Sequence, residues 1–138
     1  MIWVLDASVA TKWFFTDEPR RAQALAVRAH LANSPSQFVV PHLFMSEMLH
    51  VIARKSGNEE RFTGAALALL LQLGLRTLDL GEHGWQQAAR WCTKGLSGYD
   101  ATYFALASEL SGRWLTDDER AARRAPDLAV TLAAWSAG

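Results

Sequence analysis

The fold is decided by the stretch IWVLDASV at residues 2–9. Its first four side chains, Ile2 to Leu5, are large, mostly β-favouring and without polar alternation, which is typical of a strand covered on both faces in a parallel sheet. Asp6 ends this strand. A helix is predicted from Ala7 to Phe15, with Asp6 or Ser8 as its N-cap.

The same alternation of strand and helix continues along the chain. Further strands are predicted at residues 38–40, 75–80, 113–115 and 128–132, and helices at 17–31, 43–55, 58–73, 82–94 and 99–110, with another starting at 116–119. Strands that alternate with helices favour the α/β class and a mainly parallel sheet of four to five strands.

Length and composition indicate one ordinary globular domain, over residues 1–138. No internal repeat, low-complexity tract or long linker divides it. A chain of this size buries roughly 68–70% of the surface that its unfolded form exposes, so it needs no disulfide or structural metal. The single cysteine, Cys92, and the absence of zinc-type Cys/His spacing exclude a zinc module and favour a reducing compartment.

Hydropathy and charge indicate where in the cell the protein is located and which partners it can bind. The amino-terminal residues lack the basic region and the length of a signal peptide, and the longest apolar run, residues 65–71, is far shorter than the ~18 residues that a membrane span requires. We therefore expect a cytoplasmic protein with no membrane contact. With 14 basic and 14 acidic side chains, the net charge is zero, so any contact with nucleic acid must be local.

Four carboxylates stand at positions that a parallel sheet can bring together. Asp6 follows the first predicted strand, and Asp118 closely follows the strand at 113–115. Ligands of open parallel sheets bind beyond the carboxyl ends of the strands. Asp100 lies in the first turn of the helix that precedes that strand, and Glu47 lies in the middle of the mostly apolar helix 43–55.

Each acid alone also has a purely structural interpretation, because Asp and Glu are favoured at helix N-termini. Asp6 can cap the helix that it precedes, and Thr116 with Glu119 and Ser97 with Asp100 fit capping boxes. Glu47, in the middle of a helix, can form an ion pair with Arg54 or Lys55. Taken together, four converging carboxylates repel one another unless a cation intervenes. Hard oxygen ligands of this kind suit Mg²⁺ or Mn²⁺, and therefore phosphodiester chemistry.

Four segments resemble one known family. They are VLDASVATKWFFTDEP at residues 4–19, PHLFMSEMLHVI around Glu47, LSGYDATYFALA around Asp100 and WLTDDERAAR around Asp118. Together they resemble the PIN-domain ribonucleases, in particular the VapC toxins of bacterial type II toxin–antitoxin systems. The resemblance spans nearly the whole chain. It implies a three-layer α/β/α sandwich.

The resemblance also implies an activity and its site. The activity is a Mg²⁺- or Mn²⁺-dependent endoribonuclease, with Asp6, Glu47, Asp100 and Asp118 as its catalytic and metal-binding residues. Members of the family are usually homodimers and are held inactive by a cognate VapB-type antitoxin. An extra apolar face on residues 65–73 agrees with a homodimer.

Two further groups of residues are candidates for the site. Ser8, Thr116 and Asp117 are expected to support the metal-binding acids. The basic residues expected to contact RNA are Lys12, Arg20, Arg21, Arg120, Arg123 and Arg124, each of which can also be an ordinary surface charge.

Other interpretations stay open at this stage. A non-catalytic PIN-like module would bind RNA or a protein and use the acids structurally. A phosphatase of the haloacid-dehalogenase type would need a second Asp two residues after Asp6, where the chain has Ser8. The spacing of Glu47 and His50 fits half of a di-iron site, but no second copy is present.

Overall fold

The computed structural model describes residues 1–137, which build a five-stranded, entirely parallel sheet in the order β3-β2-β1-β4-β5. The strands are β1 (Trp3–Leu5), β2 (Phe38–Val40), β3 (Arg76–Thr77), β4 (Arg113–Thr116) and β5 (Ala129–Thr131). The helices are α1 (Ala7–Ala10), α2 (Arg21–Asn33), α3 (Leu43–Lys55), α4 (Glu60–Gln72), α5 (Glu82–Thr93), α6 (Gly98–Glu109) and α7 (Glu119–Ala122). Three 3₁₀ turns are η1 (Thr11–Trp13), η2 (Pro35–Gln37) and η3 (Leu132–Ala134).

The central strand β1 sends successive side chains to opposite faces of the sheet. Val4 and its neighbour Trp114 on β4 belong to one buried cluster, whereas Leu5 and Leu115 belong to the other. This two-residue period is the geometry of a pleated strand. Because both faces are covered, an uninterrupted apolar run at residues 2–5 is what the strand requires, as the sequence predicts.

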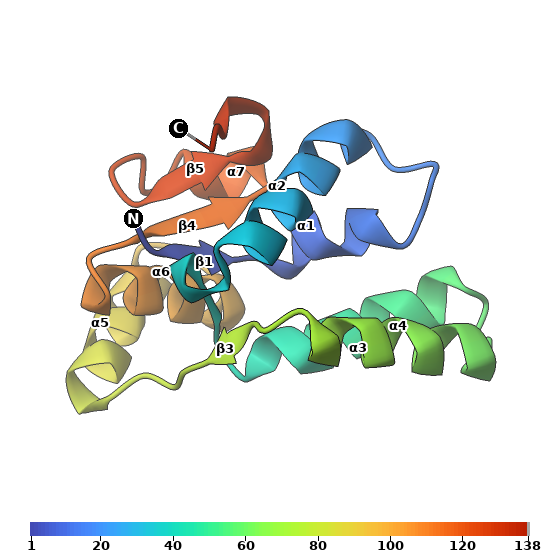
Figure 1. Ribbon diagram of the computed structural model, residues 1–138. Helices are drawn as coiled ribbons and strands as arrows, with labels where there is room; N and C mark the ends of the chain where they lie inside the picture. The colour runs from blue at the N-terminus through green and yellow to red at the C-terminus, as the bar shows by residue number, and fades with distance from the viewer. Residues whose placement is uncertain (138) are drawn as a thin grey trace.

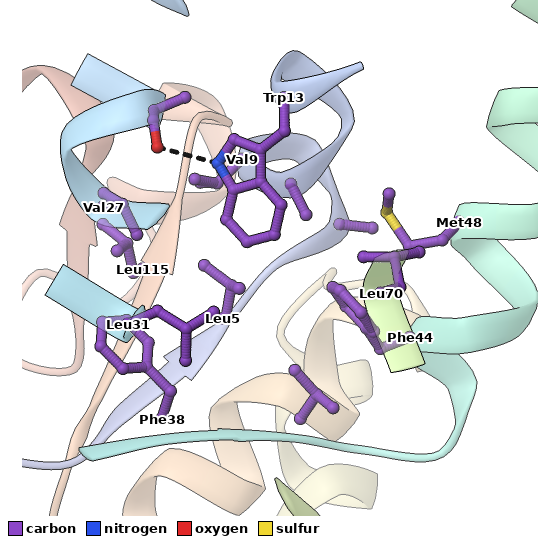
Figure 2. Packing of buried hydrophobic residues seen from close by; sticks show 14 of the residues in the cluster. Leu5, Val9, Trp13, Val27, Leu31, Phe38, Phe44, Met48, Leu70 and Leu115 are labelled. Carbon is purple, nitrogen blue, oxygen red and sulfur yellow. Dashed lines mark hydrogen bonds between the residues drawn. The ribbon is translucent and has the colours of Figure 1, made fainter. Parts of the chain in front are cut away.

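One face of the sheet is covered by α1, α2, α3 and α4 (Figure 1). Figure 2 shows Leu5, Leu31 and Phe38 packed in this layer, with Trp13 above them. The indole nitrogen of Trp13 donates a hydrogen bond of 2.8 Å to the carbonyl of Ala24 on α2. This bond satisfies the only polar atom of the buried indole and ties η1 to α2.

The other face is covered by α5 and α6, and α7 packs beside them. Every side chain from Ala101 to Ala107 on α6 is buried, and Phe104 contacts the rings of Trp91 and Trp114. A parallel sheet between two helical layers confirms the predicted three-layer α/β/α sandwich.

Some predicted boundaries are wrong. The helix expected from residue 17 begins at Arg21, because Arg20 adopts a left-handed conformation with φ 55° that interrupts it. The helix expected at 7–15 is split into α1 and η1. The strand expected at 75–80 is reduced to Arg76–Thr77, since β3 is an edge strand paired only with β2.

The apolar segment at residues 65–73 lies on α4, which runs beside α3 (Figure 1). Ala66 and Leu70 are buried against the core, while Leu69 and Leu71 are exposed. Apolar side chains outside the core-facing side of α4 are therefore open to solvent in this single chain. Over residues 1–137, none of the helices has the length and hydropathy needed to cross a membrane.

Candidate metal-dependent active site

All four predicted acids line one hollow of about 510 Å³ at the carboxyl edge of the sheet. Asp6 follows β1, Asp118 follows β4, Glu47 comes from α3 and Asp100 from the first turn of α6. Other residues that line the hollow are Ser8, Thr11, Lys12, Glu18, Arg54, Lys55 and Asp117. The fold thus brings together side chains from four separate segments.

Asp6 is held by hydrogen bonds to one of its two carboxylate oxygens. Its Oδ2 accepts hydrogen bonds from the backbone N–H of Ser8 at 3.2 Å, from the Ser8 hydroxyl, and from the Thr116 hydroxyl at 3.2 Å. The first of these bonds makes Asp6 the N-cap of α1. Capping and lining the hollow are compatible for this residue, because only Oδ2 makes the cap.

The same two hydroxyls fix the loop after β4. Ser8 Oγ accepts the backbone N–H of Asp117 at 3.0 Å, and Thr116 Oγ1 accepts that of Asp118 at 3.1 Å. Asp118 in turn accepts the N–H of Ala121 at 3.0 Å and is the N-cap of α7. The expected capping box of Thr116 and Glu119 is therefore wrong, since Asp118 is the N-cap of α7 and Thr116 Oγ1 accepts the N–H of Asp118 instead of that of Glu119.

Asp117 differs from the other acids because two cations neutralise it. Arg20 makes two hydrogen bonds to its carboxylate, at 2.7 and 3.0 Å, and Lys12 lies 3.0 Å from Oδ2. Burial raises the pKa of Asp117, but the hydrogen bonds and charges of Arg20 and Lys12 outweigh it and bring the pKa below its usual value. We infer that Asp117 organises the loop through these ion pairs.

Glu47 is held by a residue that the sequence did not suggest. Its Oε1 accepts a hydrogen bond of 2.8 Å from the hydroxyl of Tyr103, one turn after Asp100 on α6. In the described residues Glu47 pairs with neither Arg54 nor Lys55, because Lys55 contacts Glu18 at 2.8 Å instead. The structural alternative for Glu47, a helical ion pair, is therefore wrong.

Burial and mutual repulsion raise the pKa values of three acids. Burial, opposed by the hydrogen bonds from Ser8 and Thr116, raises the pKa of Asp6 to about 6, and the charge of Asp100 adds to it. Burial and the charges of Asp6 and Asp100 raise the pKa of Glu47 to about 7. The pKa of Asp100 is raised by burial and by Asp118. These acids form a concentration of negative charge that a cation would relieve.

The donor set suits a hard divalent ion, since it consists of carboxylate oxygens in one hollow. As the side chains lie, no three Asp, Glu, His or Cys residues within 1–137 are close enough together to hold a metal ion. The fit is therefore one of chemistry and charge, and the coordination geometry is not preformed.

The predicted basic residues are scattered. Lys12 lines the hollow, but it is buried and committed to Asp117, Glu18 and the Pro19 carbonyl. Arg20 lies beside the hollow, and Arg21 donates to the carbonyls of Lys12 and Trp13.

The three arginines of the chain after β4 do not line the acidic hollow. Arg120 is exposed on α7, Arg123 lines a different hollow beside β5, and Arg124 donates to the Lys94 carbonyl at 3.2 Å. The hollow is also lined by Arg54 and Lys55, two turns after Glu47, which the sequence suggested only as ion-pair partners of that acid and not as contacts to RNA. They follow Glu47 by seven and eight residues, which puts all three on one side of a helix, and this spacing is the signal that could have found them.

Comparison with known proteins agrees with this architecture. The PIN domain model matches residues 3–127. The chain belongs to the PIN domain family. No curated protein sequence matches it significantly.

Several solved structures have the same fold. VapC20 of Mycobacterium tuberculosis, a toxin that cleaves the sarcin-ricin loop, is 20% identical with a TM-score of 0.64, over 80% of this chain and 85% of that chain. VapBC2 of Rickettsia felis, bound to a promoter DNA fragment, is 12% identical with a TM-score of 0.68, over 95% and 98% of the two chains. VapBC-1 of nontypeable Haemophilus influenzae is 18% identical with a TM-score of 0.64, over 96% and 99%.

Proposed function

We propose that this PIN-domain protein is a Mg²⁺- or Mn²⁺-dependent endoribonuclease and the toxin of a toxin–antitoxin pair. The observation that carries the proposal is the convergence of Asp6, Glu47, Asp100 and Asp118 on one hollow. The pKa values of Asp6 and Glu47 are raised to about 6 and about 7. Near neutral pH, binding of a divalent cation would therefore displace the protons that these acids still hold.

In this proposal, hydrogen bonds hold two of the four acids in place for the cation. Ser8 and Thr116 hold Asp6, and Tyr103 holds Glu47, so that their remaining oxygens are available to a cation. The chemistry that a bound divalent ion supplies is activation of water and neutralisation of the charge that develops at phosphorus. The carboxylates orient the attacking water and accept its proton. No Ser, Cys or His is needed as a covalent nucleophile.

The cations at the rim supply the contact with the RNA backbone. Arg54 and Lys55 line the hollow from α3, and Lys55 also contacts Glu18 at 2.8 Å. A phosphate that enters a hollow rich in carboxylates needs such compensating charge, in addition to the metal. Ser8, Thr116 and Asp117 act as supports, and Lys12 and Arg20 act through Asp117.

The proposal includes partners and a compartment. Two of the solved structures with this fold are VapBC assemblies, which supports a VapB-type antitoxin as the partner. The exposed Phe62 and Leu69, which lie seven residues apart and so on one side of α4, support a homodimer. A toxin acting on RNA would work in the cytoplasm, as a single nuclease domain.

The test is RNA cleavage by the purified protein freed of any antitoxin. A panel of structured and single-stranded RNAs should be cut with Mg²⁺ or Mn²⁺ and left intact with EDTA. Asp100→Asn should abolish cleavage, while Asp127→Asn, an exposed acid outside the hollow, should not. Intact RNA across the panel contradicts the nuclease. RNA binding that is indifferent to EDTA and to Asp100→Asn would favour the non-catalytic binding module.

A further inference from the structure

A second hollow, of about 430 Å³, adjoins the acidic one. It is lined by Ser46, Glu47, His50, Val51 and Tyr99. Glu47 and Val51 line both hollows, and on α6 Tyr99 lines the second hollow while its sequence neighbour Asp100 lines the first. Anything bound in the acidic hollow therefore has this second space beside it.

The chemistry of the second hollow differs from that of the first. Its wall is mostly apolar, and its volume is in the range of small-ligand sites. The Tyr99 side chain is 66% exposed, so its ring contributes little to the core. Ser46 and His50 are also exposed and offer a hydroxyl and an imidazole beside that ring. An open aromatic face with polar groups next to it is what an unstacked nucleobase binds.

We propose that this hollow is a base-binding subsite, in which one nucleobase next to the cleaved phosphate stacks on Tyr99 and meets Ser46 and His50 with its edge. This inference rests on the proposed function, since it assumes that the phosphate lies in the acidic hollow. A base in an RNA duplex has no free face, so the subsite selects single strands and loops. Tyr99 is thereby a specificity residue, outside the chemical step.

The first test is kinetic and uses the shortest oligoribonucleotide that the wild-type protein cleaves. A series of this RNA lacks the base at one position at a time around the cleaved bond. One abasic position should lower kcat/KM by about 5- to 150-fold, the range that base stacking on an aromatic ring usually gives. Tyr99→Ala should lower kcat/KM on intact RNA by a similar factor and lose the sensitivity to that position.

Two variants complete this test. Tyr99→Phe keeps the ring and should therefore keep the wild-type sensitivity to that abasic position. Trp85→Ala removes another exposed aromatic, 54% exposed on α5, that lines neither hollow, and should also behave like wild type. If Tyr99→Ala stays as sensitive as wild type to every abasic position, the subsite is wrong.

The second test does not depend on cleavage. A short oligoribonucleotide with 2-aminopurine in place of one base at a time should lose fluorescence when the probe stacks on Tyr99, and this quench should disappear in Tyr99→Ala but remain in Trp85→Ala. A Tyr99-dependent quench without cleavage of any RNA would support the subsite and contradict the nuclease. Cleavage with neither this quench nor the abasic effect would support the nuclease activity and overturn the subsite. If the protein neither cleaves RNA nor quenches the probe, both the nuclease activity and the subsite are wrong.

Discussion

The hydroxyl of the buried Tyr103 donates a hydrogen bond of 2.8 Å to Glu47 Oε1 and so connects α6 to α3 beside the acidic hollow that Glu47 lines. Burial, with the charges of Asp6 and Glu47, raises the pKa of Tyr103 far above its usual value, so the hydroxyl remains a donor. The bond opposes the rise in the pKa of Glu47 that burial causes. Tyr103 is therefore a positioning residue for a proposed metal ligand.

Tyr103→Phe should move the pH dependence of cleavage. Without the hydrogen bond the pKa of Glu47 rises further, so the ionised form that binds metal is reached at higher pH. The acidic limb of the kcat/KM profile should shift to higher pH, and the free energy of unfolding should fall by about 1 kcal/mol. Tyr99→Phe, which removes an exposed hydroxyl from the same helix, is the matched control and should leave the limb in place.

The stability of the metal-free protein should fall as pH rises from 5 to 8. The folded-state pKa values of Asp6 and Glu47, about 6 and 7, lie above the ordinary 3.8 and 4.5. The folded protein thus holds these protons more tightly, and this contribution is complete below about pH 4 and lost as pH rises through 6 and 7. Thermal unfolding in EDTA measures it, and a Tm that rises over this interval would contradict the pKa values.

Asp100→Asn should leave the metal-free protein as stable as wild type, or more stable, at pH 8. The substitution removes a charge that raises the pKa values of Asp6 and Glu47, which offsets the ~0.3–1 kcal/mol that an acid contributes at a helix N-terminus. The cap of α6 is kept, because Ser97 Oγ accepts the Asp100 N–H at 3.0 Å. Thermal unfolding in EDTA at pH 8 and 5 is the measurement. A large loss at pH 8 would indicate a structural role for Asp100.

Asp117→Asn should destabilise the protein by about 3 kcal/mol, the cost typical of breaking a buried ion pair. The Lys12 side chain is only 4% exposed, and its nearest carboxylate is that of Asp117. The substitution would leave this ammonium group without its main counter-charge. Urea unfolding gives the difference directly. Asp127→Asn, at an exposed position, should change stability by less than about 0.5 kcal/mol, and equal effects of the two would refute the argument.

Arg54→Ala should weaken RNA binding more than Arg124→Ala. Arg54 lines the acidic hollow, whereas Arg124 is engaged with the Lys94 carbonyl elsewhere. Loss of one phosphate contact to a single strand should raise KM and reduce the slope of log K against log salt by about 0.7. Binding measured over a series of salt concentrations separates the two variants. An unchanged slope for Arg54→Ala would place the RNA backbone elsewhere.

The sequence predicts the strands of the sheet and the places of the acids relative to them, because both depend on local patterns. The apolar run before Asp6 and the helix 43–55 with Glu47 are found where expected. The parallel topology follows from the alternation of elements. It brings the residues that follow β1 and β4 to one edge, so the convergence of Asp6 and Asp118 can be anticipated.

The partners of these acids could not be predicted, since they depend on contacts between distant segments. From the sequence, Tyr103 is expected to be one more packing residue of a mostly apolar helix, yet its hydroxyl donates a hydrogen bond to Glu47 on α3. Lys12 reads as a surface charge, yet the fold closes Asp117 and Glu18 over it. Arg123 and Arg124 follow Asp118 closely, but the turn after α7 directs them away from the hollow.

The contact between Thr116 and Asp6 joins residues 110 positions apart in the chain. The middle strand β1 pairs with β4, which comes much later in the chain. A ribosome therefore synthesises Asp6 long before Thr116. Until residues beyond Asp118 have emerged, Asp6 lacks both the Thr116 hydroxyl and the strand on one side of it. A nascent chain therefore carries no assembled acidic hollow until β4 and the loop after it have been synthesised.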